Sequence, residues 1–266
     1  MTVSLITLGT LSDSQLAKTI RLSLDFASQL VDEWIFVFYH QLEIDNFSSY
    51  LSNHSLSLDR FSLVLLSCCH GISASLNLAV SYVSCSWILI LHSGDALRSL
   101  PPRYYSQISS ILLASSTSDI LIFGTRYISN GSVVGYSGHS NRRLFLDKFI
   151  PWVPHESTFI PRDFHKQNLY DVNLTSAMDY DFFLRAFTSS SIYIKTFPLY
   201  ITDFSSGGTS SNILRSCLDV RHSFYRRIQL RPAIFMYVLS WLFFVYVFLR
   251  KHLFIQLSSF GRVYFK

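Results

Sequence analysis

An imidazole and a carboxylate stand just beyond a short apolar run of the chain. Residues 87–91 (Trp-Ile-Leu-Ile-Leu) are apolar at every position, which is typical of a strand buried on both faces of a parallel sheet. His92 and Asp95 follow, with Gly94 between them. Ligands bind beyond the carboxyl ends of such strands, and a carboxylate there can hold a divalent cation that in turn holds phosphate. The same residues also fit a plain turn, in which Gly94 supplies an unusual backbone angle and Asp95 caps the next segment.

Two further sets of residues that could take part in catalysis or binding lie later in the chain. Asp179 and Asp181 fall in the first turn of a predicted helix, where the helix dipole favours negative charge, so either could serve only to stabilise that helix. His155 lies in a short stretch bounded by prolines, where a packed loop histidine bonded to the backbone is the structural alternative.

Length and composition limit the classes of protein to consider. A chain of 266 residues can bury a substantial core as one large domain, with or without an appended segment. Hydrophobic residues make up 49%, charged residues only 15%, and the mean hydropathy is +0.29, so membrane contact has to be considered. The net charge of +5 is modest, and the first two hundred residues hold no dense Lys/Arg run. Nucleic acid is therefore not indicated, and an anionic membrane surface or a phosphorylated substrate fits better.

The cysteines and the N-terminus indicate the compartment. None of the four cysteines has Cys-x-x-Cys spacing, which disfavours zinc sites and disulfide frameworks and makes reduced cytosolic thiols the expectation. The N-terminal residues lack a basic region and a long apolar region, so they predict a first strand rather than a signal peptide. We therefore expect the main domain to stay in the cytoplasm.

Segments of strand and helix character alternate through the first hundred residues. The predicted strands are residues 3–8, 34–39, 61–66 and 87–91, and the predicted helices are residues 16–31, 42–51 and 73–84. Ser12 or Asp13 could cap the first helix. Such β-α-β alternation predicts a doubly wound α/β domain with parallel strands.

The pattern changes after Asp95. It predicts a helix over residues 104–114, short strands at 119–123, 192–194 and 199–201, a hairpin turn at 130–131 and a helix from residue 177.

The C-terminal part is a separate element. Residues 232–249 contain no charged side chain, and a helix of this length spans roughly 27 Å, close to the hydrocarbon thickness of a bilayer. Basic residues flank it on both sides, so it predicts a membrane-associating segment, with a buried or dimerisation helix as the alternative. The flanking charges do not distinguish spanning from lying in the interface. We divide the chain into a main domain, residues 1–215, and a basic, hydrophobic segment, residues 216–266.

Several segments, in this order, resemble the family-two glycosyltransferases. Residues 71–77 and 87–95 are similar to segments of that family that read GIYDAMN and WIxFLNSGD. Residues 155–159 look like its HQSTF segment, and residues 178–185 look like its acidic segment, often EDYELWLR or SDYDLxLR. The resemblance covers about residues 1–210 and points to the enzymes of bacterial capsule, colanic acid and O-antigen assembly. Each motif alone is weak, whereas the ordered set is fairly specific.

The resemblance implies the GT-A fold, an α/β fold with a mixed, mainly parallel sheet flanked by helices, followed here by the C-terminal hydrophobic helix. It implies a hexosyltransferase that moves a sugar from a nucleotide-sugar donor to a hydroxyl of a lipid-linked or polysaccharide acceptor, with inversion at the anomeric carbon. The expected location is the cytoplasmic side of the cell membrane, with residues 232–249 as the anchor.

The resemblance also implies roles for matching residues. Asp95 would coordinate a divalent cation, Mg²⁺ or Mn²⁺, that bridges the donor diphosphate and neutralises the charge of the leaving group. Asp179 would be the general base that takes the proton of the acceptor hydroxyl. His155 would line the acceptor side or the diphosphate, and Gly71 and Asn77 would lie near the donor. Without the resemblance, Asn77 could simply cap or bridge a turn.

Three positions depart from the family's pattern. Phe38 stands where the second strand usually ends in an Asp that holds the base or ribose. Cys69 lies in a segment, residues 67–70, without the acid that usually contacts the base, and His92 replaces the first acid or amide of the metal motif. Phe38 or Tyr39 could stack on the base instead, and His92 could meet phosphate. The alternative function is a catalytically silent, membrane-anchored partner of a true transferase.

Overall fold

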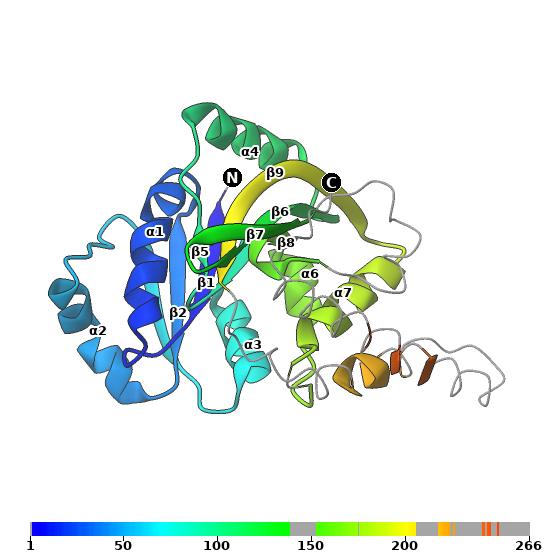
Figure 1. Cartoon of the computed structure of the whole chain (residues 1–266), viewed down its shortest axis with the longest axis horizontal. Coiled ribbons are helices and arrows are strands. Elements are labelled where there is room, and N and C mark those ends of the chain that lie inside the picture. The colour runs from blue at the N-terminus through cyan, green and yellow to red at the C-terminus, as the bar shows by residue number, and fades with distance from the viewer. Residues whose placement is uncertain are drawn as a thin grey trace.

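The computed structural model of the chain describes residues 2–138, 153–174, 176–205 and 218–223, and also Arg226, Trp241, Leu242, Phe244, Val245 and Leu249. These residues build a mixed sheet with helices on both faces (Figure 1). The order of its strands is β3-β2-β1-β4-β8-β6-β9-β5, and β7 pairs with β6.

The first half is the predicted doubly wound unit. Its strands are β1 (Val3–Leu8), β2 (Glu33–Phe38), β3 (Ser62–Ser67) and β4 (Trp87–His92), all mutually parallel. Its helices are α1 (Ser14–Leu30), α2 (Gln41–Asn53) and α3 (Ile72–Tyr82). Asp13 caps α1, because its carboxylate accepts a hydrogen bond of 2.8 Å from the backbone N–H of Gln15.

The second half mixes strand directions. Its strands are β5 (Ala96–Leu97), β6 (Asp119–Ser129), β7 (Ser132–Ser137), β8 (Thr158–Pro161) and β9 (Tyr193–Ser205). β8 is antiparallel to both β4 and β6, while β9 is parallel to β6 and antiparallel to β5. Its helices are α4 (Pro102–Ala114), the 3₁₀ turn η1 (His155–Ser157), α6 (Arg162–Gln167) and α7 (Met178–Thr188). The expected predominance of parallel pairing therefore holds in the first half only.

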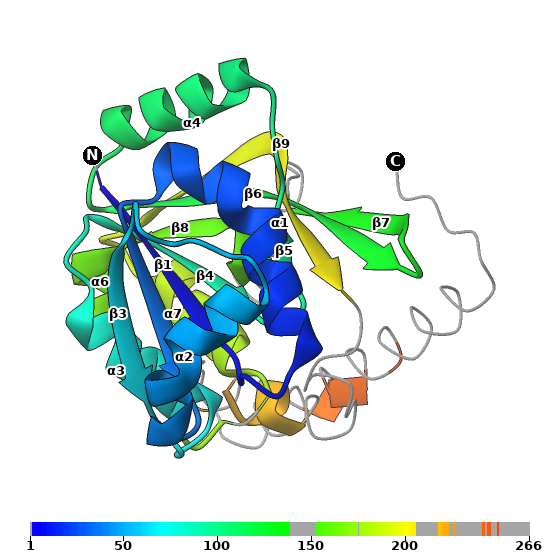
Figure 2. The same cartoon turned by 90° about the vertical axis from the view of Figure 1, so that its left-hand side faces the viewer.

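Two apolar layers enclose the sheet. Side chains alternate along a strand, so Leu5 and Leu89 join the layer under α1, α2 and α4, while Ile6 and Ile90 join the layer under α3, α6 and α7. Figure 2 separates α1 from α3 and α6 on opposite sides of the strands. This covering on both faces explains the uninterrupted apolar runs of β2 and β4, which are buried at each of these positions.

Two sequence expectations need correction. The short strands predicted at residues 192–194 and 199–201 are parts of one strand, β9, whose pairing with β6 continues past Pro198 through shifts of register. Phe38 is only 1% exposed and packs against Phe36 and Phe47 in the layer under α2, so it is not available to stack on a base.

The predicted apolar helix at residues 232–249 lies outside the described residues, apart from five helical positions within it. The boundary predicted between residues 215 and 216 lies outside them too. In the described part of the chain, no helix combines the length and the apolar character needed to cross a bilayer.

Candidate active site

The turn after β4 is fixed to β1 and α1. Gly94 has a φ of +103°, a conformation that side chains rarely adopt, which explains glycine at this position. The N–H of Ser93 donates to the carbonyl oxygen of Leu8 at 3.0 Å, and the N–H of Gly94 donates to Oγ1 of Thr19 at 2.9 Å. The Ser93 hydroxyl donates to Oδ2 of Asp13 at 2.7 Å. The turn is therefore a rigid support for the carboxylate that follows it.

Asp95 is buried at the end of this turn. Its side chain does not cap the next segment; Oδ1 accepts a hydrogen bond of 3.0 Å from the N–H of Ser205, at the end of β9. Burial, together with the negative charge of Glu156, raises the pKa of Asp95 to about 7. A nearby cation would therefore stabilise its ionised form strongly.

Two histidines meet beside this carboxylate. The ring centroids of His92, at the end of β4, and His155, in η1, lie 5.0 Å apart in an edge-to-face arrangement. Burial and the positive charge of His155 lower the pKa of His92 to about 3, so this imidazole is neutral. Burial also pulls the pKa of His155 down, but the hydrogen bond to Asp179 and the charge of Glu156 outweigh it and raise that pKa to about 9. His155 is therefore an imidazolium at neutral pH.

Asp179 and Asp181 have different surroundings. Oδ2 of Asp179 lies 3.6 Å from Nδ1 of His155, and although burial opposes ionisation, the bond and charge of His155 lower the pKa of this carboxyl. Asp181 instead accepts from Nε of Arg185 at 3.0 Å and from the hydroxyl of Ser223 at 2.6 Å. Asp179 therefore faces the histidine pair, while Asp181 ties α7 to the segment at residues 218–223.

Glu156 also lies beside the histidine pair, although the sequence analysis did not identify it as a candidate site residue. It is 3% exposed, and its Oε2 lies 3.5 Å from Nδ1 of His155. The signal was an acid directly after His155, at the position where the resembling segment has Gln. His155 thus sits between two carboxylates, Glu156 and Asp179. Its other ring nitrogen, Nε2, is buried and has no hydrogen-bond partner within the described residues, so it is free to bind a ligand.

Neither Gly71 nor Asn77 has a described contact with the histidine pair or with its neighbouring carboxylates. Gly71 precedes α3 with a φ of +91° and is exposed. The side chain of Asn77 donates to the carbonyl oxygen of Tyr170 at 2.9 Å and accepts from its N–H at 2.8 Å. Asn77 therefore clamps α3 to the loop after α6, which fits the structural alternative for this residue.

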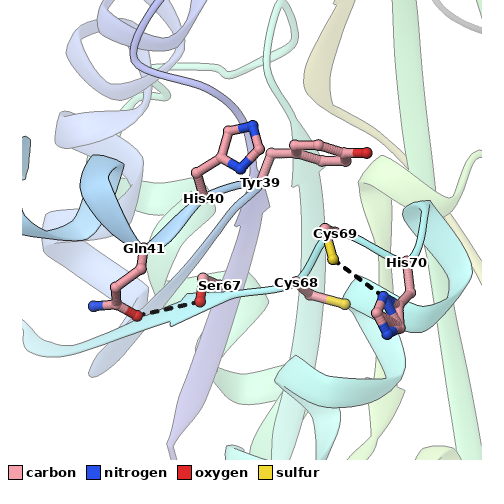
Figure 3. A pocket seen from close by; sticks show the side chains of 7 residues that line it. All are labelled: Tyr39, His40, Gln41, Ser67, Cys68, Cys69 and His70. Carbon is pink, nitrogen blue, oxygen red and sulfur yellow. Dashed lines mark hydrogen bonds between the residues drawn. The ribbon is translucent and has the colours of Figure 1, made fainter.

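An open cavity of about 360 Å³ lies beyond the carboxyl ends of β2 and β3 (Figure 3). Its lining residues are Tyr39, His40, Gln41, Ser67, Cys68, Cys69 and His70. None of these seven carries a carboxylate. Tyr39, which follows Phe38 directly, is 53% exposed and is the aromatic ring available here.

Glu43 fixes the rim of this cavity. Its carboxylate accepts from the N–H groups of Tyr39 at 3.0 Å, His40 at 3.1 Å and Leu11 at 2.8 Å, and also from the hydroxyl of Thr10. The N-terminal end of α2 thus holds the loop after β1 and the loop after β2 in a fixed relation.

The described residues contain no group of three or more His, Cys, Asp or Glu side chains placed to hold a metal ion.

Comparison with protein-family models and with curated proteins finds no match. Solved structures do resemble the chain. TarS 1-349 from S. aureus in complex with UDP matches it with a TM-score of 0.55 at 13% identity, over 88% of this chain and 68% of that one. The complex with UDP-GlcNAc matches with a TM-score of 0.57 at 14% identity, over 88% and 69%. A longer TarS structure gives 0.53, over 88% of this chain and 41% of that one. At this identity the likeness establishes the fold, a mixed α/β fold consistent with the GT-A type.

Proposed function

We propose that the chain is a glycosyltransferase that moves a sugar from a nucleotide-sugar donor to a hydroxyl group of an acceptor. The observation that carries this proposal is a cluster of four side chains near the carboxyl end of β4, one of the four parallel strands. The cluster consists of His92, Asp95, His155 and Asp179. The carboxyl ends of parallel strands are where such folds bind ligands. The fold likeness to structures that hold UDP and UDP-GlcNAc supports the same choice of donor class.

In this proposal Asp179 is the general base. Its lowered pKa keeps it ionised at neutral pH, as a base must be, and 38% of its side chain is exposed, so an acceptor can reach it. Asp179 takes the proton of the acceptor hydroxyl while that oxygen bonds to the anomeric carbon. The bond from this carbon to the diphosphate breaks, and in-line attack inverts the configuration. The free Nε2–H of His155 donates to a diphosphate oxygen and steadies the leaving nucleotide.

A divalent cation could bind at Asp95 if the donor phosphates and water supplied its other ligands. Mg²⁺ is commonly held by one or two carboxylates together with substrate phosphates and water. Asp95 would supply the carboxylate, since the N–H of Ser205 holds its Oδ1 in place and the nearby charge of His155 offsets burial only in part, leaving the pKa raised. When bound, such an ion would offset the charge that develops on the diphosphate.

The cavity beyond β2 and β3 would receive the nucleoside. Tyr39 would stack on the base, and the amide and hydroxyl of Gln41 and Ser67 would take the place of the missing acids. His92, being neutral, would meet phosphate only as a hydrogen-bonding group.

The proposed acceptor is lipid-linked or a surface polysaccharide, and the proposed location is the cytoplasmic side of the cell membrane. Support comes from the sequence: residues 232–249 carry no charge, and Arg226, Arg231 and Arg250 flank them. Such a segment would keep the enzyme beside acceptors at an anionic surface.

One observation favours a second function. The nucleoside cavity has no carboxylate, which fits a silent relative that binds a true transferase instead of a donor. Calorimetry with UDP, with and without Mn²⁺, and transfer assays with a panel of nucleotide sugars separate the two. Binding of UDP that weakens on Tyr39→Ala, together with metal-dependent turnover, supports the enzyme. A folded protein that binds no nucleoside diphosphate and turns over no donor supports the silent partner.

A further inference from the structure

One thiol in the cavity beyond β2 and β3 is paired with an imidazole. Sγ of Cys69 lies 3.2 Å from Nδ1 of His70, and both side chains are exposed (Figure 3). This contact is close enough for the imidazole to accept the proton of the thiol. A thiolate, rather than a thiol, is the form that attacks electrophiles, and a neighbouring histidine raises its population.

The other described cysteines lack these features. Cys68 is half-buried and packs against the apolar layer under α3, and Cys85 is 4% exposed. Their accessibility ranks Cys69 first, Cys68 second and Cys85 last. The sulfur of Cys69 also lies in the lining of the cavity, in contact with the imidazole of His70.

We propose that Cys69 is a covalent modification site that reacts with small disulfides and alkylating electrophiles, activated by His70 and acting as a switch on the cavity. The exposed position gives the reagent access, and the open space of about 360 Å³ gives room for a small adduct.

The reaction with a low-molecular-weight disulfide balances as a simple exchange. The proton of Cys69 passes to Nδ1 of His70, and the thiolate attacks one sulfur of the disulfide. A bond forms between Sγ of Cys69 and that sulfur while the original S–S bond breaks. The leaving thiolate takes the proton from His70, so the products are a mixed disulfide and one small thiol. A reducing thiol reverses the exchange.

The consequence for ligand binding rests on the proposed function. Tyr39 and His40 line the cavity from the end of β2, and Cys69 and His70 line it from the end of β3. An adduct on Sγ of Cys69 would occupy the space assigned above to the nucleoside. Modification would then stop donor binding without touching Asp95 or Asp179.

The test measures the reaction rate of each cysteine in the folded full-length protein. Iodoacetamide is added at neutral pH for increasing times, and peptide mapping by mass spectrometry assigns the label to each thiol. We expect Cys69 to react at least about tenfold faster than Cys68 and Cys85. The variant H70N should slow Cys69 several-fold, whereas H40N, which removes the other imidazole of the cavity, should leave the rate unchanged.

Equal rates for Cys69 and Cys68, or an H70N rate equal to that of wild type, would overturn the assignment of a paired, reactive thiol. Circular dichroism of each variant confirms that the comparison is between folded proteins. Because this arm needs no nucleotide, it decides the modification site even if the proposed function fails.

A second arm tests the switch. The protein is treated with oxidised glutathione and titrated with UDP by calorimetry, before and after reduction. Loss of UDP binding that reduction restores, and that C69S no longer shows while C68S still does, supports the switch. An adduct on Cys69 that leaves UDP affinity unchanged overturns it. If the unmodified protein binds no UDP, the failure belongs to the proposed function, and the labelling rates alone decide.

Discussion

Asp179 at the start of α7 and His155 in η1 form an ion pair, with Oδ2 and Nδ1 3.6 Å apart. The pair joins two segments that are distant in the sequence and that lie on different elements of the second half. Its electrostatics are mutual: the carboxylate raises the pKa of the imidazole, and the imidazolium lowers the pKa of the carboxyl. The first two predictions follow from this relationship.

Asp179 and Asp181 form a natural pair of test and control. We expect D179N to fold normally and to lose about 10²–10⁴-fold of the proposed transferase turnover, because the proposed general base is removed. D181N should keep its turnover per folded molecule but melt at a lower temperature, since Arg185 and Ser223 lose a charged partner in a buried position. Steady-state assays and thermal melts check both. Equal turnover by wild type and D179N would refute the assigned base.

The ion pair also makes stability depend on pH. The pKa of His155 is raised from 6.5 to about 9, so its contribution is complete below about pH 6.5 and is lost as the pH rises through about 9. The lowered pKa of Asp179 sets the acid limit of the pH range in which the ion pair stabilises the fold: its contribution is present above pH 3.8 and is lost on further acidification. We therefore expect the difference in Tm between wild type and H155Q to be largest between about pH 4 and 6.5 and to shrink towards pH 9. A difference that grows at alkaline pH would contradict the pairing.

The pKa of Asp95 is shifted in the opposite direction to that of Asp179, so its effect on stability has the opposite dependence on pH. Its pKa is raised from 3.8 to about 7, so the folded state holds the proton more tightly than the unfolded state, and stability falls as the pH rises between these values. D95N should match wild type near pH 4 and exceed its Tm by several degrees at pH 8. Added Mn²⁺ should raise the Tm of wild type at pH 8 and leave D95N unchanged. A Mn²⁺ shift of equal size in D95N would place the metal elsewhere.

Asn77 separates a structural role from contact with the donor. N77A leaves the N–H and the carbonyl oxygen of Tyr170 without their partners, which should cost about 1–3 kcal/mol of unfolding free energy. The affinity of the folded variant for UDP should not change. Denaturant melts and calorimetry give the two quantities independently. A loss of UDP affinity at unchanged stability would support the position near the donor that the family resemblance implies.

The first half of the fold could be predicted from sequence because its signals are local. Apolar runs of strand length and helical spacing between them define β1 to β4 and α1 to α3 to within a few residues. β8 and β5 are only four and two residues long, so neither has a periodic pattern of its own. β9 was divided because Pro198 normally ends a strand, whereas here the shifted register with β6 absorbs it.

The candidate site was predicted in part for similar reasons. Motif positions named His92, Asp95, His155 and Asp179, and these residues do lie together, through contacts or through their charges. Glu156 was missed because its effect arises from burial beside two other ionisable groups, which no local pattern reveals. The exposure of Phe38 was misjudged for the same kind of reason: both faces of β2 are buried, and Phe47 of α2 packs on Phe38 at the end of the strand.

The position of β8 also sets the order in which the site can form. This four-residue strand pairs with β4 through Ile160 and with β6 through Phe159, and it begins directly after η1. The four parallel strands and the turn that carries Asp95 precede it in the chain and can assemble first during synthesis. His155 reaches His92 only when β8 has closed this long-range pairing, which is a slow step in chain folding. Asp95 and His92 therefore take their places early and His155 late, so this group of side chains is complete only after β8 has paired.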